Sequence, residues 1–231
     1  MAKTEVLDLG GSLVAQETMD IDFLKKIRTF LIDWLEEDDE RKLIIIIGGG
    51  HPARVFQNAY REVTGSEANH DEQDWIGIMA TRLNAQLVHA LFSKYCFDDV
   101  VYDPTVIKTM TGRVLVGAGW KPGWSTDYDA VLLAEAFGAE RVLNLSNISK
   151  VYTADPRKDP NAQPLDAISW TDYRAMCGDE WTPGMNAPFD PVASKKAHEI
   201  GLNVIVADGR DLDNLGKILD GGDFTGTVIS K

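Results

Sequence analysis

Residues 43–47 (LIIII) restrict the possible folds of this chain more than any other stretch. Five consecutive apolar residues, four of them β-branched, predict a strand covered on both faces, as in a mainly parallel sheet. The run continues directly into Gly48-Gly49-Gly50, and a helix is expected over residues 53–63. A buried strand followed by a turn and a helix is the repeating unit of α/β proteins.

The same alternation of strands and helices runs through the whole chain. Strands are predicted at residues 6–9, 113–116, 141–145, 203–207 and 225–229, with weaker signals at 100–101 and 106–107. Helices are predicted at residues 21–35, 74–94, 171–177, 191–200 and 213–219. Residues 66–73 and 182–190 are expected to be loops, and residues 151–170 a loop-rich stretch with a possible hairpin. The pattern predicts a single domain over residues 1–231, an α/β three-layer αβα sandwich with a central, mainly parallel sheet.

Three glycine-rich turns follow predicted strands, at residues 10–11, 48–50 and 117–123. The carboxyl ends of parallel strands meet at one edge of a sheet, so the turns should gather there, where α/β proteins bind ligands. The third turn leads through Ser125, Thr126 and Asp127, all good N-cap residues, into a helix that reaches Phe137. Unpaired N–H groups at a helix start favour an anion, so a phosphate site is predicted, with an ordinary helix cap as the alternative.

Composition excludes several classes of partner. The net charge of −13 argues against nucleic acid and anionic membranes as partners. The two cysteines are isolated and the four histidines are scattered, so neither a disulfide scaffold nor a metal site built by the protein is expected. The chain has no run of about 18 apolar residues and no signal pattern at its start, so a cytoplasmic location is expected.

Eight motifs follow one another along nearly the whole chain. They are LGGS (9–12), IIGGG (46–50), DWIGIMATRLNA (74–85), STDYDAVLLAEAFGA (125–139), NLSNISKVYTADPRKDPNA (144–162), TPGMNAPFDPVASKKA (182–197), VADGRDLDNL (206–215) and GTVI (226–229). In this order they resemble the amino acid kinase family and, within it, the uridylate (UMP) kinases, especially the archaeal-type branch. The resemblance implies phosphoryl transfer from ATP, with its Mg²⁺, to UMP. It also implies a homo-oligomer, often a hexamer.

The resemblance assigns the donor nucleotide mainly to the second half of the chain, about residues 121–231. ATP would be held by residues from two motif groups: Gly10, Gly11 and Ser12 at its phosphates, and Tyr152 and Asp155 at its adenine and ribose. Asp155 precedes a proline and could instead start a turn, and Tyr152 could be ordinary core.

The resemblance assigns the acceptor to about residues 1–120. Gly49, Gly50 and Arg54 match positions that bind the phosphate of UMP, and Asp74 matches the acidic residue for its nucleoside. An arginine one turn past the glycines suits bidentate phosphate binding, although it could also be a solvated helix residue. Asp74 could instead be only the N-cap of its helix.

Transfer itself would take place beside Thr126 and Asp127, and here the chain departs from the family pattern. A lysine usually stands two residues before the first glycine turn, where this chain has Asp8. A carboxylate there would repel triphosphate oxygens, so Asp8 is expected to point away or to pair with a cation, or the missing charge comes from elsewhere. Lys121 is the first candidate to supply that charge, and Lys150 is the second.

Two other functions remain open. One is a kinase for another small phosphate acceptor, such as isopentenyl phosphate, although His51 lies closer to its glycine turn than the histidine of that relative. The other is a non-catalytic nucleotide-binding or storage protein, because Asp8 replaces the lysine. In either case His51 is expected to have a structural role.

Overall fold

The chain folds around a seven-stranded sheet, and the computed structural model describes residues 4–180 and 187–231. Strand β1 (Thr4–Leu9) lies between β2 (Lys42–Ile47) and β4 (Arg141–Ser146). The outer strands are β3 (Val114–Gly117), β8 (Asn203–Asp208), β9 (Thr227–Ser230) and β7 (Ala167–Ser169), in the order β3-β2-β1-β4-β8-β9-β7. The five neighbouring strands β3, β2, β1, β4 and β8 are parallel to one another, and β9 runs antiparallel to β8. The predicted mainly parallel sheet is confirmed.

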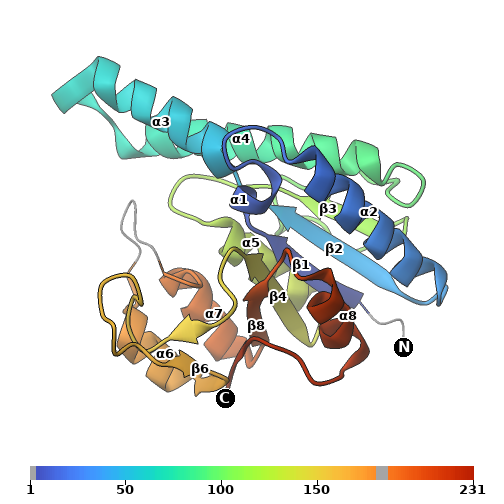
Figure 1. The fold of residues 1–231 in the computed structure, drawn as a ribbon. Helices are drawn as coiled ribbons and strands as arrows, with labels where there is room; N and C mark the ends of the chain where they lie inside the picture. The colour runs from blue at the N-terminus through green and yellow to red at the C-terminus, as the bar shows by residue number, and fades with distance from the viewer. Residues whose placement is uncertain (1–3, 181–186) are drawn as a thin grey trace.

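Helices cover both faces of the sheet and complete a three-layer αβα sandwich (Figure 1). One face packs against α2 (Ile21–Glu36), α4 (His70–Leu91) and α8 (Leu212–Asp220). The opposite face packs against α5 (Thr126–Phe137), α6 (Trp170–Cys177) and α7 (Pro191–Ile200). Helix α3 (Gly50–Thr64) lies along α4, and the two helices extend beyond the sheet as a long hairpin (Figure 1). The predicted fold class is therefore correct.

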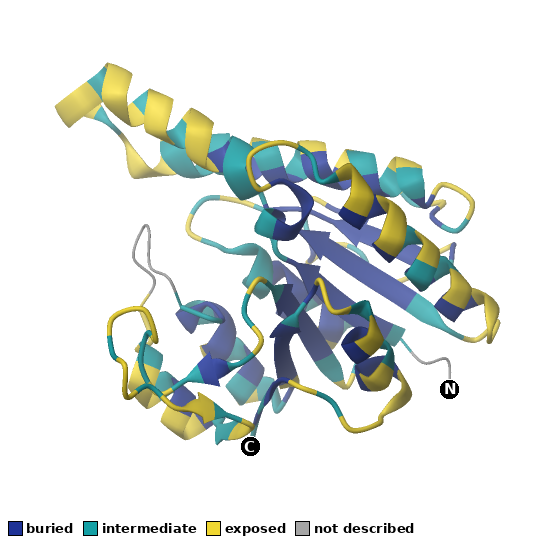
Figure 2. Cartoon of the chain, in the orientation of Figure 1, coloured by how far each residue is buried: buried dark blue, intermediate teal, exposed yellow. Residues whose placement is uncertain are grey.

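The burial of the strands follows from their sequences. Strands β1, β2, β3, β4 and β8 are buried along most of their length, whereas the outer sides of the helices are exposed (Figure 2). Residues 43–47 are each at most 1% exposed, as the uninterrupted apolar run predicts for a strand covered on both faces.

The alternation of side chains along β1 decides where Asp8 points. Successive side chains of a strand point to opposite faces of the sheet. Leu7 and Leu9 lie in the core under α2, whereas Val6 lies in the core under α5. Asp8 follows Val6 by two residues, so its side chain lies on the α5 face, where it is buried.

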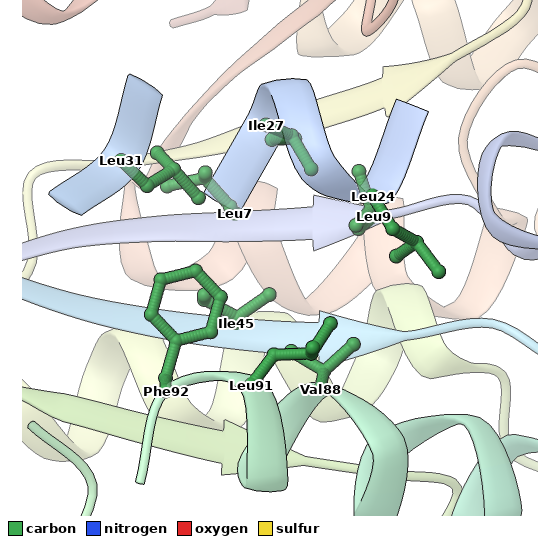
Figure 3. Close-up of a pocket in the computed structure, with 9 residues that line it drawn as sticks. All are labelled: Leu7, Leu9, Leu24, Ile27, Leu31, Ile45, Val88, Leu91 and Phe92. Atoms are coloured by element: carbon green, nitrogen blue, oxygen red, sulfur yellow. The ribbon is translucent and has the colours of Figure 1, made fainter. Parts of the chain in front are cut away.

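A small apolar gap lies between α2 and α4, over β1 and β2 (Figure 3). Its lining consists of aliphatic and aromatic side chains from four elements: Leu7, Leu9, Leu24, Ile27, Leu31, Ile45, Val88, Leu91 and Phe92. The gap has a volume of about 10 Å³, which is about the space of one water molecule. It offers no polar group to a phosphate, so it belongs to the hydrophobic core.

Helix α4 begins at His70, four residues before the predicted start. Asn69 has an extended backbone, and its side chain accepts hydrogen bonds from the N–H groups of Asp71 (2.8 Å) and Glu72 (3.3 Å). Asp74 therefore lies in the second turn, and its interpretation as an N-cap is wrong. The loop expected at residues 66–73 is mostly helical, since the 3-10 turn η1 (Gly65–Glu67) precedes α4.

Other boundaries also differ from the prediction. Residues 11–14 form the one-turn helix α1 (Gly11–Val14) in place of a turn, and α3 begins at Gly50 because Pro52 is tolerated in a first helical turn. No strand forms at residues 106–107, since the side chain of Asp103 accepts from the N–H of Thr105 and closes a turn.

The loop-rich stretch after β4 contains the predicted hairpin, formed by β5 (Val151–Tyr152) and β6 (Pro164–Leu165). It also contains β7, which the sequence analysis missed because the strand has only three residues at the sheet edge. Most of the loop predicted at residues 182–190 lies outside the described residues, which omit 181–186.

Candidate active site

A cleft of about 300 Å³ opens between the α3–α4 hairpin and the segment that links β3 to α5. Its lining comes from three stretches of the chain: Gly49, Gly50, Ala53, Arg54, Gln57, Asp74, Gly77, Ile78, Thr81, Gly119, Trp124, Ser125 and Thr126. The volume is at the lower end of the range for small-molecule sites. The second and third glycine turns thus meet at the carboxyl edge of the sheet, as predicted.

The first glycine turn packs directly against the second. A side-chain carbon at Gly11 would lie 2.1 Å from the backbone nitrogen of Gly50 and 2.6 Å from the carbonyl carbon of Gly48, so only glycine fits. The N–H of Gly10 donates to the carbonyl of Leu145 at the end of β4 (2.8 Å). Gly10, Gly11 and the adjoining Ser12 therefore stand next to the cleft, between the ends of β1, β2 and β4.

All four predicted acceptor residues line the same cleft. Gly49 and Gly50 begin α3, and Arg54 follows one turn later on the same helix. Arg54 is exposed and makes no hydrogen bond or ion pair with another residue in the described parts of the chain. Its guanidinium is therefore available to an anionic ligand.

Asp74 ties α4 to the third glycine turn. Its Oδ2 accepts a hydrogen bond from the N–H of Gly123 (3.0 Å). Gln57 lies in the same cleft, where its Nε2 donates to the carbonyl of Gln73 (3.0 Å). The sequence analysis did not select Gln57, although its position one turn after Arg54 on α3 was a usable signal.

The start of α5 forms the opposite wall. The Oγ of Ser125 accepts from the N–H of Tyr128 (3.3 Å), so Ser125 is the N-cap, and Thr126 lines the cleft as predicted. Trp124 also lines the cleft, and its ring packs against that of Tyr128, with ring centroids 4.2 Å apart and the ring planes inclined by 39°. Trp124 is a further residue that the sequence analysis did not select.

Asp127 connects three elements behind this wall. Its Oδ2 accepts from the N–H of Asp190 at the start of α7 (2.7 Å), and its carboxyl group lies beside that of Asp8 at the end of β1. Asp8 therefore faces Asp127 and does not line the cleft, and it pairs with no cation among the described residues, contrary to the expectation of a cation partner. Within residues 4–180 and 187–231, no group of three or more His, Cys, Asp or Glu side chains is arranged to hold a metal ion.

Two further carboxylates lie nearby, and the sequence analysis missed both. Burial raises the pKa of Asp129 to about 8, although the hydrogen bond that its Oδ2 accepts from the N–H of Trp120 (3.1 Å) acts to lower it. Burial also raises the pKa of Asp190 to about 6, and the negative charge of Asp127 contributes to both shifts. Asp190 had a sequence signal, because an aspartate directly before a proline is a typical helix start.

The structure does not bring either candidate lysine to the cleft lining. The Nζ of Lys121 lies 3.8 Å from the ring centroid of Trp120, and the side chain is exposed. Lys150 forms an ion pair with Asp166.

Tyr152 and Asp155 lie on the β5–β6 hairpin and its turn and do not line the cleft. The Oδ1 of Asp155 accepts from the N–H of Arg157 (3.0 Å), so Asp155 closes a turn, which does not by itself decide whether the residue binds ATP. The guanidinium of Arg157 also holds the Asp155 carboxylate and lowers its pKa to about 2.

Comparisons with known proteins agree with this geometry. The model of the amino acid kinase family matches residues 3–208. The chain is 34% identical to a uridylate kinase of Methanospirillum hungatei (99% of this chain and 95% of the relative covered) and 32% identical to one of Thermococcus kodakarensis (97% and 98%). The crystal structure of uridylate kinase from Archaeoglobus fulgidus matches with a TM-score of 0.82 and 30% identity, over 99% of this chain and all of that one. The chain therefore belongs to the amino acid kinase family.

Proposed function

We propose that this protein is an ATP-dependent phosphotransferase that converts UMP and ATP to UDP and ADP. The cleft that gathers Gly49, Gly50, Arg54 and Asp74 supports the proposal most directly, because it combines a cation for a phosphate with a carboxylate for a nucleoside. The similar proteins named above are uridylate kinases that align with the chain over almost their whole length.

Such a reaction depends on alignment and on charge stabilisation, without a covalent enzyme intermediate. We propose that Arg54 binds the UMP phosphate through two parallel hydrogen bonds from its guanidinium group, and that Asp74 accepts a hydrogen bond from a hydroxyl group of the nucleoside. Gly49 and Gly50 line the same cleft as these two side chains. Residues 1–120 would thus supply most of the acceptor site.

The donor is proposed to enter as the Mg-ATP complex, with its Mg²⁺ as part of the substrate. Gly10, Gly11 and Ser12 would hold its phosphates at the edge of the cleft, and Thr126 and Asp127 would line the path of transfer. Tyr152 and Asp155 are proposed to bind the adenosine, so residues 121–231 would supply most of the donor site.

Lys121 remains our candidate for the positive charge that Asp8 does not supply. Its ammonium group lies over the ring of Trp120 in an exposed position. Only this cation–π contact would have to break for the ammonium group to bind a phosphate. Lys121→Ala is expected to lower kcat at least about tenfold, through loss of an interaction with developing charge, and to leave the melting temperature unchanged. Near-normal turnover of this variant would reject Lys121 and leave Lys150.

Phosphorus NMR of the protein with Mg-ATP and UMP tests the function itself. The single phosphate signal of UMP is expected to decline together with those of ATP, while the diphosphate signals of UDP and ADP appear. A spectrum without UDP under saturating Mg-ATP would contradict the proposal. The position of His51 does not favour isopentenyl phosphate as the acceptor. The residue does not line the cleft, and its backbone N–H donates to the carbonyl of Ala15 (2.9 Å).

We further propose a cytoplasmic homo-oligomer, with a hexamer as one possibility. The α3–α4 hairpin carries six of the large apolar side chains that are exposed: Val55 (45%), Phe56 (65%), Val63 (86%), Trp75 (40%), Met79 (58%) and Leu83 (70%). A group of exposed apolar side chains is typical of a protein–protein interface. No helix in the described parts of the chain is long and apolar enough to cross a membrane. Light scattering on the purified protein gives the assembly mass directly.

A further inference from the structure

Asp8 is a buried carboxyl group with an oxygen that lacks a partner. The residue is 2% exposed, and its Oδ2 has no hydrogen-bond partner among the described residues. Its backbone is fixed in the sheet, where Asp8 lies beside Ile46 of β2 and Asn144 of β4. The side chain therefore cannot turn to solvent without a break in the sheet.

The groups that act on Asp8 are carboxylates from two other elements. Asp127 and Asp129 come from the first turn of α5, and Asp190 caps α7. None of these four aspartates forms an ion pair with a lysine, arginine or histidine in residues 4–180 and 187–231. Two ionised carboxylates at hydrogen-bonding distance in a buried site repel strongly, so one of the pair retains a proton.

The hydrogen bonds around the Asp8–Asp127 pair indicate which of the two carboxyl groups keeps the proton. Asp127 accepts a hydrogen bond from the N–H of Asp190, which stabilises a carboxylate, whereas no backbone N–H of the described residues donates to the Oδ2 of Asp8. Burial raises the pKa of Asp8 well above its ordinary value, and the charge of Asp127 raises it further. Burial also raises the pKa of Asp127, but its bonds with Asp8 and with the N–H of Asp190 lower it.

We propose that Asp8 works as a neutral carboxylic acid that donates a hydrogen bond to Asp127 and so positions the Asp127 carboxylate beside the transfer site. The effect on catalysis rests on the proposed kinase function, whereas the shared proton does not. A neutral Asp8 removes the repulsion that a carboxylate would exert on the phosphates of ATP. It is a positioning residue, because it acts through Asp127 and has no contact with the cleft.

Asp8→Asn is the sharpest test, because an asparagine keeps the donor and the shape but has no proton to lose. The variant is expected to keep kcat within about threefold of the original protein near neutral pH, since the donated bond survives. In the original protein kcat is expected to fall on the alkaline side as Asp8 loses its proton, and this fall should be absent in Asp8→Asn. Asp8→Ala removes the donor and is expected to lower kcat at least about tenfold, with smaller changes in KM for ATP and UMP.

Two variants serve as controls. Asp129 also titrates in the alkaline range, so Asp129→Asn should retain the fall in kcat if Asp8 causes it. Glu5, at the other end of β1, is equally buried but forms an ion pair with Arg141 (2.8 Å). Glu5→Gln is therefore expected to lower stability without a change in the shape of the pH profile.

Carboxyl-carbon NMR of the labelled, unmodified protein needs neither a variant nor activity. The Asp8 signal is expected to show the protonated form through neutral pH, and this result would stand even if UMP were not the acceptor. An ionised Asp8 at neutral pH would overturn the proposal. Loss of activity in Asp8→Asn, together with a higher Mg²⁺ requirement, would also overturn it, because Asp8 would then act as an anion that binds a cation.

Discussion

Replacement of Arg54 by alanine is expected to raise the KM for UMP about 10- to 150-fold. A charge-assisted hydrogen bond to a phosphate contributes about 1.5–3 kcal/mol, and each 1.4 kcal/mol is about a factor of ten in affinity. Arg54 has no protein partner in the described parts of the chain, so its removal leaves no unpaired group in the free enzyme. Steady-state kinetics with varied UMP at saturating Mg-ATP measures the change.

Arg61 is the matched control. It lies seven residues further along α3, about 10 Å away at the rise of an α-helix, and it bonds with Asn58 outside the cleft. Arg61→Ala should leave the KM for UMP unchanged. An unchanged KM in Arg54→Ala would mean that the acceptor phosphate binds elsewhere. An equal rise in both variants would indicate a general electrostatic effect.

Asp129→Asn is expected to stabilise the protein at alkaline pH by about 3–5 kcal/mol. Asp129 is 1% exposed, its Oδ1 has no partner among the described residues, and its pKa of about 8 lies far above that of a free aspartate. The native state then binds a proton that the unfolded chain has released. Each unit of pKa difference between the native and unfolded states corresponds to about 1.36 kcal/mol. From the total, about 1–3 kcal/mol is subtracted once, because the buried amide of the variant is imperfectly paired.

The sign of this effect follows from the raised pKa. In the original protein, the stability linked to Asp129 is fully present below about pH 4, declines as the pH rises towards 8, and then levels off. The advantage of Asp129→Asn in the free energy of unfolding should therefore grow from about pH 4 to pH 8. Urea denaturation at several pH values measures it.

Asp20→Asn should show the opposite sign. Hydrogen bonds from the N–H of Phe23 and from Arg210 lower the pKa of Asp20, so its charge stabilises the native state once the pH exceeds the ordinary aspartate range. This variant should therefore lose stability as the pH rises out of the acid range. A gain in both variants would indicate only a reduced net charge, and no gain in Asp129→Asn would contradict the raised pKa.

The sequence predicted the fold well wherever hydrophobic pattern and helix caps agreed. The apolar run at residues 43–47 and the Asp20 cap before α2 each specify one structure locally. Helix α4 started earlier than predicted, because its first turn is polar and only the Asn69 side chain reveals the start. Strand β7 was missed because its pairing partner β9 lies some 60 residues away in the chain.

The acceptor cleft was predictable because its residues follow glycine turns that a parallel sheet brings to one edge. The carboxylate cluster was only partly predictable. The sequence marked Asp8 as a departure, but its contact with Asp127 depends on which face of β1 it occupies and on where α5 and α7 begin. Lys121 was expected to face the cleft, yet its ammonium group lies on the ring of the preceding residue, Trp120, and the residue does not line the cleft.

The most direct test of the proposed reaction is ADP release from Mg-ATP with UMP, CMP, AMP, isopentenyl phosphate or no acceptor. Strong release with UMP and little with the other acceptors is the expected result. Release with isopentenyl phosphate in preference to UMP would assign the cleft to a different substrate. No release with any acceptor, while ATP binding is confirmed separately, would contradict kinase activity and favour a nucleotide-binding protein.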